Sequence, residues 1–213
     1  MKRVSFLGAG SWGTALAILC ANNGHQVTVW SKVKDEITML RENREHIERL
    51  PGIKLPDNII IEDDLKQACA GQDILVFSVA SPFVRPTAQE AKPYIKENQI
   101  VVNVGKGIED DTLMTLCEIL EDELPTADVS VLSGPSHAEE VSRGIPTTVV
   151  VGAKSKKTAM FVQDVFMSDS FRVYTSPDIT GIELGGALKN VIALAAGILD
   201  GMGMGDNTKA ALM

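Results

Sequence analysis

The sequence predicts an α/β fold in which a doubly wound, mostly parallel sheet carries helices on both faces. Two observations support this fold class. Short β-rich runs alternate with helical patterns along most of the chain, and a glycine-rich loop follows the first of these runs directly. Parallel strands need crossover segments between them, usually helices, so this alternation indicates a parallel sheet. Ligands of such sheets bind beyond the carboxyl ends of the strands, so we expect functional residues in the loops there.

Six segments have the composition of strands, because β-branched residues are frequent in them and turn residues bound them: residues 4–7, 26–30, 74–79, 100–104, 129–132 and 147–151. Six others show the apolar spacing of helices: residues 12–22, 34–42, 65–70, 84–94, 113–120 and 156–167. A further apolar stretch, residues 179–199, is as long as a membrane span. Glu183, Lys189 and Asn190 near its centre argue against insertion, so we expect no membrane span.

The composition argues against several classes of protein. With 213 residues, 45% of them hydrophobic, the chain can bury a sizeable core. A formal net charge of −8 argues against non-specific binding of nucleic acid. The three cysteines have the spacing of neither a zinc site nor a disulfide framework, and the N-terminus lacks the apolar run of an export signal. We therefore expect a cytoplasmic protein with reduced thiols and no metal site.

The loop after the first strand reads GAGSWG, which places Gly8, Gly10 and Gly13 in G-x-G-x-x-G register before a helix. Gly8 permits a tight turn, Gly10 lets the backbone approach a pyrophosphate, and Gly13 lets the helix pack close to the strand. The helix N-terminus then faces the negative charge. The pattern alone also fits a plain tight turn, but its position between a strand and a helix favours a dinucleotide.

The end of the second strand bears on which dinucleotide is bound. A site for NAD places an Asp or Glu about 20 residues after the loop, where it holds the ribose 2′-hydroxyl. This sequence has Ser31 and Lys32 there, with Lys34 nearby. A cation suits a 2′-phosphate, so we expect NADPH to be preferred over NADH. The alternative is that both lysines are solvated surface residues.

Lys106 lies between Gly105 and Gly107 at the carboxyl end of another predicted strand. The spacing of the surrounding residues does not match a Walker A phosphate loop. The pattern instead predicts an ammonium group at the ligand-binding edge of the sheet. An ordinary surface lysine in a turn is the alternative.

Two further loops after strands carry helix-start signals. In SGPSHAEE, Ser136 and Glu139 form a capping box, so capping is the first role we expect for Ser136. Gly134 in the same loop leaves room for a ligand at the helix start. In the loop after residue 79, Ser81 and Pro82 are expected to be the N-cap and the first-turn proline of a helix.

Lys189 lies inside the long apolar stretch. Its neighbours on the same face of a helix are Gly185, Gly186, Ile192 and Ala193. Interior glycines cost a helix about 1 kcal/mol each relative to alanine, so we expect a helix or a ligand to approach this face closely. A partly desolvated lysine would have a lowered pKa and would exchange protons near neutral pH. A lysine that extends into solvent is the alternative.

Together these segments resemble one family, the bacterial NAD(P)-dependent glycerol-3-phosphate dehydrogenases. The similar segments are GAGSWGTALA, NVGKGIE, LSGPSHAEEV, ELGGALKNVIALAAGI and GMGMGDNTKAAL, in the family's order over essentially the whole chain. The resemblance implies a Rossmann domain followed by an all-helical domain, here residues 1–178 and 179–213. It also implies reversible hydride transfer between NAD(P)H and dihydroxyacetone phosphate, which yields sn-glycerol 3-phosphate for phospholipid synthesis.

The resemblance further implies roles for individual residues. Besides the glycines of the loop, those implied in cofactor binding are Ser11, Trp12, Ser31, Lys32, Lys106 and Ala138. Those implied in substrate binding are Lys106, Gly134, Ser136, Lys189, Asn207 and Lys209. Lys189 would be the general acid that protonates the developing alkoxide, and the base in the reverse direction.

The sequence departs from the family pattern at three places. Family members continue beyond the segment that ends at Met213, so we expect a C-terminally truncated piece that is inactive alone and lacks an Arg-Asn pair for the substrate phosphate. Arg49 stands where an aromatic residue is usual, and Ala80 replaces a frequent proline. We expect neither of these two residues to touch the chemistry.

Two other functions are alternatives. A β-hydroxyacid dehydrogenase has a similar domain plan, but an asparagine follows its helix lysine four residues later; here Ala193 has that position and Asn190 is adjacent to the lysine. A redox-sensing NADP-binding module would explain the glycine loop but not Lys106 and Lys189 together. The expected partner is a small-molecule substrate, with a homodimer as the candidate assembly and no nucleic acid.

Overall fold

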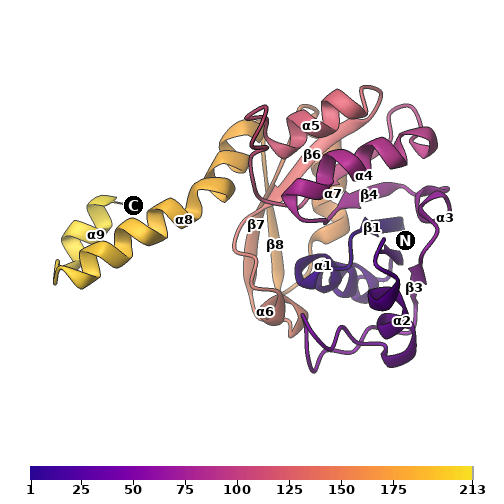
Figure 1. Cartoon of the computed structure of the whole chain (residues 1–213), viewed down its shortest axis with the longest axis horizontal. Coiled ribbons are helices and arrows are strands. Elements are labelled where there is room, and N and C mark those ends of the chain that lie inside the picture. The colour runs from indigo at the N-terminus through magenta and orange to yellow at the C-terminus, as the bar shows by residue number, and fades with distance from the viewer. Residues whose placement is uncertain (213) are drawn as a thin grey trace.

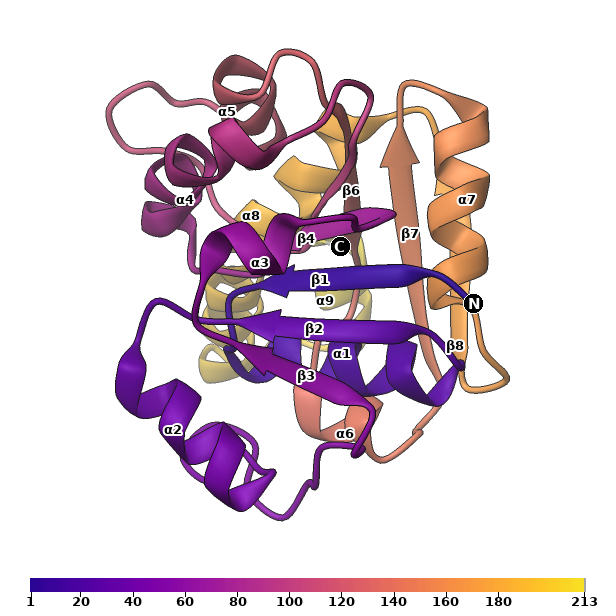
Figure 2. The ribbon, with the colours of Figure 1, turned by 90° about the vertical axis from the view of Figure 1, so that its right-hand side faces the viewer.

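The computed structural model describes residues 1–212, which form an eight-stranded sheet with flanking helices (Figure 1). The strands are β1 (Arg3–Leu7), β2 (Gln26–Trp30), β3 (Ile59–Glu62), β4 (Ile74–Phe77), β5 (Ile100–Asn103), β6 (Asp128–Ser133), β7 (Thr147–Ala153) and β8 (Phe171–Ser176). Their order is β3-β2-β1-β4-β5-β6-β7-β8, and every pair is parallel except β6 with β7. Figure 2 shows β1, β2 and β3 side by side and pointing the same way. The part from β3 to β6 has the 3-2-1-4-5-6 order of a Rossmann sheet.

Helices cover both faces of this sheet, as the alternation of elements predicts. They are α1 (Ser11–Asn22), α2 (Lys34–Asn43), α3 (Leu65–Cys69), α4 (Val84–Ala91), α5 (Leu116–Glu123), α6 (Ala138–Ser142), α7 (Lys156–Phe166), α8 (Ile179–Gly201) and α9 (Asp206–Leu212), with 3₁₀ turns at Ser81–Phe83 and Lys92–Tyr94. One apolar core lies between the sheet and α1, α2, α6 and α7. The other lies between the sheet and α3, α4 and α5.

The predicted strands are confirmed, but the two strands at the ends of the sheet were not predicted. Strands β1 and β4 are buried almost throughout, and β4 reads as an unbroken apolar run because helices cover both of its faces. β3 and β8 are edge strands in which buried and exposed residues alternate, as with Phe171 and Arg172. β3 nevertheless has three consecutive isoleucines at its start, so the composition that identified the other strands is present there too and was overlooked in a strand of four residues.

A capping box and a proline move two of the predicted helix boundaries. α5 begins at Leu116, not at residue 113, because Thr115 and Glu118 form a reciprocal capping box. α4 ends at Ala91, and a 3₁₀ turn that contains Pro93 follows it, since proline cannot continue the helical hydrogen bonds.

α8 leaves the sheet and carries α9 at its far end, so the two helices form an arm (Figure 1). The axis of α8 turns by 45° between Ala187 and Lys189. The bend comes just after Gly185 and Gly186, which have no side chains to resist it. Within residues 1–212, no single helix is long and apolar enough to cross a membrane. The two halves of bent α8, Ile179–Ala187 and Lys189–Gly201, reach the length and apolar composition of a membrane span only when they are taken together.

Candidate functional site

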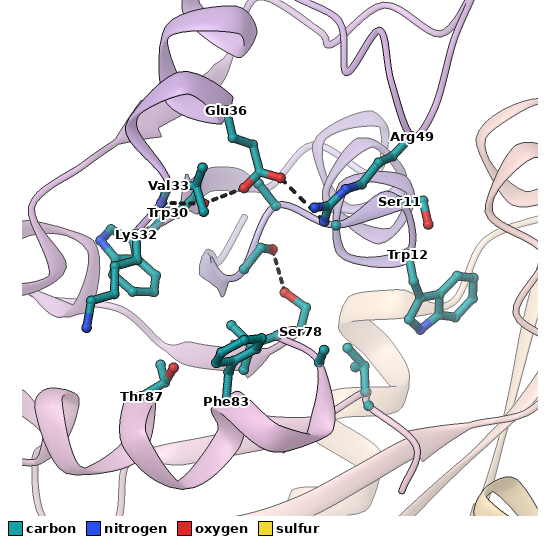
Figure 3. Close-up of a pocket in the computed structure, with 18 of the residues that line it drawn as sticks. Ser11, Trp12, Trp30, Lys32, Val33, Glu36, Arg49, Ser78, Phe83 and Thr87 are labelled. Atoms are coloured by element: carbon teal, nitrogen blue, oxygen red, sulfur yellow. Dashed lines mark hydrogen bonds and ion pairs between the residues drawn. The ribbon is translucent and has the colours of Figure 1, made fainter.

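A cavity of about 640 Å³ lies at the carboxyl ends of β1, β2, β4 and β5, the edge at which this fold places ligands (Figure 3). Its volume is typical of a small-molecule site. Its lining includes many of the predicted residues: Gly8, Gly10, Ser11, Trp12, Ser31, Lys32, Lys106 and Ser136.

The glycine loop forms one wall of this cavity. Gly8 has a φ of 119°, and a Cβ there would lie 2.6 Å from the backbone nitrogen of Val79, so a larger residue does not fit. Beside Gly10 the space is open, since the nearest atom to a Cβ would be Arg49 Nη1 at 3.8 Å. α1 begins at Ser11, and no side chain caps its first turn. Open space beside uncapped N–H groups fits a pyrophosphate.

Six of the predicted residues are outside the lining of the cavity: Gly13, Gly134, Ala138, Lys189, Asn207 and Lys209. A Cβ at Gly13 would lie 2.6 Å from Ser78 Oγ, so this glycine lets α1 pack closely, as predicted. Gly134 has a φ of 155°, and a Cβ there would lie 2.9 Å from Val149 Cα. Strand β7 therefore occupies the space that a Cβ at Gly134 would need, so close packing requires a glycine here. The contact of Gly134 with a ligand stays a prediction.

The corner after β2 holds a cation and a buried carboxylate. Lys32 forms an ion pair with Glu90 of α4, and the lysine side chain is 70% exposed. The hydroxyl of buried Ser31 donates a hydrogen bond to Glu36 Oε2. The cation predicted for this corner is present, but a carboxylate from across the cavity partly neutralises it.

Lys106 and Ser136 meet at the cavity. Lys106 Nζ donates a 2.7 Å hydrogen bond to Ser136 Oγ and lies 6.0 Å from the ring centre of Trp12. Burial lowers the pKa of Lys106, and the nearby charge of Lys189 lowers it further. The predicted capping role of Ser136 is wrong, because α6 has His137 as its N-cap and no side-chain cap. Since an ammonium group only donates, the Ser136 hydroxyl keeps its own proton for a ligand.

Lys189 is exposed, so the partial burial predicted for it is not observed; Lys106 is the lysine that burial affects. The close approach predicted for this face of α8 is confirmed at Gly186. A Cβ there would lie 3.1 Å from Ser133 Oγ and 3.4 Å from Lys106 Cγ. What approaches α8 at Gly186 is therefore the stem of Lys106 and the side chain of Ser133 at the end of β6.

A buried hydrogen-bond network joins α8 to the loop that carries Lys106. Glu183 Oε1 accepts from Asn103 Nδ2 at 3.1 Å and from the backbone nitrogen of Cys117 at 2.9 Å. Asn103 Oδ1 accepts in turn from the nitrogen of Gly105 at 2.9 Å. One carboxylate thus fixes the start of α8 to β5, to α5 and to the lysine loop. A glutamate within an apolar helix was the sequence signal for this role.

Asn207 and Lys209 lie on α9, at the far end of the arm from the sheet (Figure 1). Lys209 Nζ lies 2.9 Å from Asp200 Oδ1 and 3.2 Å from Asp206 Oδ1. The hydrogen bond to Asp200 is the main cause of the raised pKa of Lys209. The structure does not bring these two predicted residues to the cavity.

Other lining residues were not selected from the sequence. Glu36 lies close to the position, about 20 residues after the glycine loop, at which an NAD site has its acidic residue. This spacing could have identified Glu36 as a lining residue. It was overlooked because Ser31 and Lys32 occupy the end of the strand itself. Arg49 and Ala80, the two departures from the family pattern, also line the cavity. Within residues 1–212, no group of three or more His, Cys, Asp or Glu side chains is placed to hold a metal ion.

The strand order, the glycine loop and the cavity beside it define a dinucleotide-binding protein of the Rossmann class. A family model for the N-terminal part of NAD-dependent glycerol-3-phosphate dehydrogenase matches residues 3–159, and the model for its C-terminal part matches residues 178–213. The chain belongs to the NAD-dependent glycerol-3-phosphate dehydrogenase family.

Similar proteins agree with this assignment. The chain is 60% identical to a glycerol-3-phosphate dehydrogenase [NAD(P)+] of Agathobacter rectalis, and the match covers all of this chain and 63% of that protein. It is 50% identical to the enzyme of the same name from Bacillus subtilis, again over 63% of that protein. The crystal structure of glycerol-3-phosphate dehydrogenase from Coxiella burnetii superposes with a TM-score of 0.90 at 32% identity, over 99% of this chain and 65% of that one. The chain thus spans just under two thirds of the length of these relatives.

Proposed function

We propose that this chain is the cofactor-binding part of a cytoplasmic dehydrogenase. The enzyme interconverts dihydroxyacetone phosphate and sn-glycerol 3-phosphate with NAD(P)H, prefers NADP(H), and supplies glycerophospholipid synthesis. The observation that carries the proposal is the 2.7 Å contact of Lys106 Nζ with Ser136 Oγ, in a cavity that the glycine loop also lines. The names of the relatives support the same reaction.

We place the domain boundary of this protein after residue 178. The sheet ends with β8 at Ser176, and α8 begins at Ile179. Residues 1–178 would then be the dinucleotide-binding domain, and 179–213 would open the helical substrate domain. A homodimer is the assembly that we consider for the whole protein.

The cofactor would lie along the glycine loop. The first turn of α1, with Ser11 and Trp12, would hold the pyrophosphate, and the Ser31–Lys32 corner would hold the adenosine ribose. Ala138, at the start of α6, remains a proposed cofactor contact. When bound, the nicotinamide supplies or accepts the hydride.

Two ammonium groups would serve the substrate. The charge of nearby Lys189 contributes to the lowered pKa of Lys106, so an anionic phosphate ester beside the two ammonium groups would relieve their repulsion. Lys106 and Ser136 would bind and orient the substrate, with Gly134 alongside. Lys189 would donate a proton to the carbonyl oxygen as negative charge develops there, which stabilises the transition state more than the ground state. Asn207 and Lys209 are proposed to complete the substrate site.

The first test is binding of the reduced dinucleotides to this chain. Both of its tryptophans, Trp12 and Trp30, line the cavity, so bound NADPH should accept excitation energy from them. We expect saturable energy transfer with NADPH and with NADH, and tighter binding of NADPH. Failure of both nucleotides to bind would contradict the proposal.

The second test is turnover of a chimeric enzyme, in which this chain is joined to the C-terminal part of the Agathobacter rectalis relative. We expect it to oxidise NADPH when dihydroxyacetone phosphate is added. Lys189→Met should slow turnover by about 10²–10⁴-fold, the usual contribution of a general acid, while NADPH binds as before. A chimera that binds NADPH but turns over neither this substrate nor a β-hydroxyacid would favour the sensor alternative.

A further inference from the structure

Four side chains form a connected cluster in and beside one wall of the cavity: Ser31, Glu36, His46 and Arg49. Figure 3 shows Glu36 and Arg49 of this cluster facing each other. Glu36 is buried at its centre, with 8% of the residue exposed. One carboxylate oxygen accepts from Ser31, and the other lies 3.0 Å from His46 Nε2 and 3.5 Å from Arg49 Nη1. Both oxygens of the carboxylate are therefore occupied by partners from the protein itself.

The cluster contacts both the backbone and the guanidinium group of Arg49. The backbone nitrogen of Arg49 donates to His46 Nδ1 at 3.3 Å, so the proton of that ring is on Nε2, which donates to Glu36. The guanidinium group of Arg49 reaches the same carboxylate. Burial raises the pKa of Glu36, but hydrogen bonds from His46 and Ser31 and the charge of Arg49 outweigh it, so the net pKa is lowered. Glu36 thus stays ionised and keeps Arg49 in place.

The guanidinium group of Arg49 remains available to a ligand. Its side chain is 58% exposed, and among residues 1–212 Glu36 is its one ion-pair partner. Nη1 lies at the open space beside Gly10, and Figure 3 shows the group near Ser11. An arginine carries five N–H donors in a planar fork that matches phosphate oxygens, so four of them are left for an anion. Lys32, by contrast, is already paired with Glu90.

We infer that Arg49, held by Glu36 and His46, binds the 2′-phosphate of NADP(H) and sets the preference of this site for NADP(H) over NAD(H). The inference rests on the proposed function, in that the cavity must hold a dinucleotide. An NAD site offers a free carboxylate to the ribose 2′-hydroxyl. Here both oxygens of Glu36 are already paired with protein groups. The group that faces the cavity is instead the guanidinium of Arg49, a cation. Arg49 is therefore a specificity-determining residue, and Lys32 makes the smaller contribution.

The test compares Arg49→Gln with Lys32→Gln as its matched control, by titrating each variant and the unmodified chain with NADPH and NADH. Loss of a charge-assisted hydrogen bond corresponds to about a ten- to hundredfold weaker binding, so we expect this loss for NADPH in Arg49→Gln. NADH should bind within about twofold of its original affinity, because it lacks the 2′-phosphate. Lys32→Gln should weaken NADPH binding less, and Arg49→Lys should restore part of the lost affinity.

The other outcomes overturn the inference in distinguishable ways. Equal weakening of both nucleotides in Arg49→Gln would assign this residue to the shared pyrophosphate. A larger loss in Lys32→Gln than in Arg49→Gln would return the specificity to the end of β2. If the unmodified chain binds neither nucleotide, the proposed function fails and the inference fails with it. Arg49 is mostly exposed, and an unchanged thermal unfolding profile of Arg49→Gln would show that the variant is folded.

Discussion

The sheet domain and the α8–α9 arm differ in how far their apolar side chains are buried. In the sheet domain, Phe6 and Phe77 are fully buried between strands and helices. On the arm, Val191 is 61% exposed and Leu194 is 68% exposed, although α8 is as apolar as a core helix. Burial needs a second surface, and α8 meets the sheet domain only through its first turns (Figure 1).

This difference means that the two regions are stabilised in different ways. Close packing stabilises the sheet domain, so its residues respond to changes of a single methyl group. The arm depends on its intrinsic helix propensity and on the buried anchor at Glu183. The same substitution, glycine to alanine, should therefore have opposite effects in the two regions.

The largest effect is expected for Gly8→Ala in the sheet domain. The added Cβ would lie 2.6 Å from the backbone nitrogen of Val79, and Gly8 has a φ of 119° that alanine disfavours. Overpacking and backbone strain each cost about 1–3 kcal/mol, so we expect a loss of roughly 2–6 kcal/mol in the free energy of unfolding. Urea denaturation measures it, and an unchanged midpoint would mean that the loop relaxes freely.

The anchor between the two regions should give an intermediate effect. Glu183→Ala leaves the N–H of Cys117 buried without its acceptor, at about 1–3 kcal/mol, while Asn103 Nδ2 keeps the carbonyl oxygen of Gly105 at 3.4 Å. Glu183→Gln keeps a carbonyl acceptor and should lose less. Asp200→Ala removes an exposed pair with Lys209 on the arm and should cost at most about 1 kcal/mol. The three denaturation midpoints should follow this order, and equal losses would refute the anchor.

The smallest effect, of opposite sign, is expected for Gly185→Ala on the arm. A Cβ there meets no atom within 4 Å, so alanine should stabilise α8 by about 0.5–1 kcal/mol. The adjacent Gly186→Ala is the matched control, because its Cβ would lie 3.1 Å from Ser133 Oγ and should offset that gain. Amide hydrogen exchange along α8 measures both variants. Slower exchange in Gly186→Ala than in Gly185→Ala would contradict the assigned contacts.

The candidate site was only partly predictable from the sequence. The glycine loop and Lys106 were found because turn chemistry and position after a strand are local signals. Ser136 was given a capping role by an equally local pattern, but an ammonium from another loop engages its hydroxyl instead. Arg49 was set aside because nothing near it in the sequence indicates that its loop folds back over Gly10.

The pattern of the chain itself is enough to specify the fold class, the central strands and the dinucleotide loop, because hydrophobic periodicity and glycine geometry act over a few residues. The Arg49 cluster and the Glu183 anchor depend on the assembled fold. Glu183 and Asn103 are 80 residues apart in the sequence and 3.1 Å apart in space. Contacts of this kind arise only when separate elements pack together, and no local pattern encodes them.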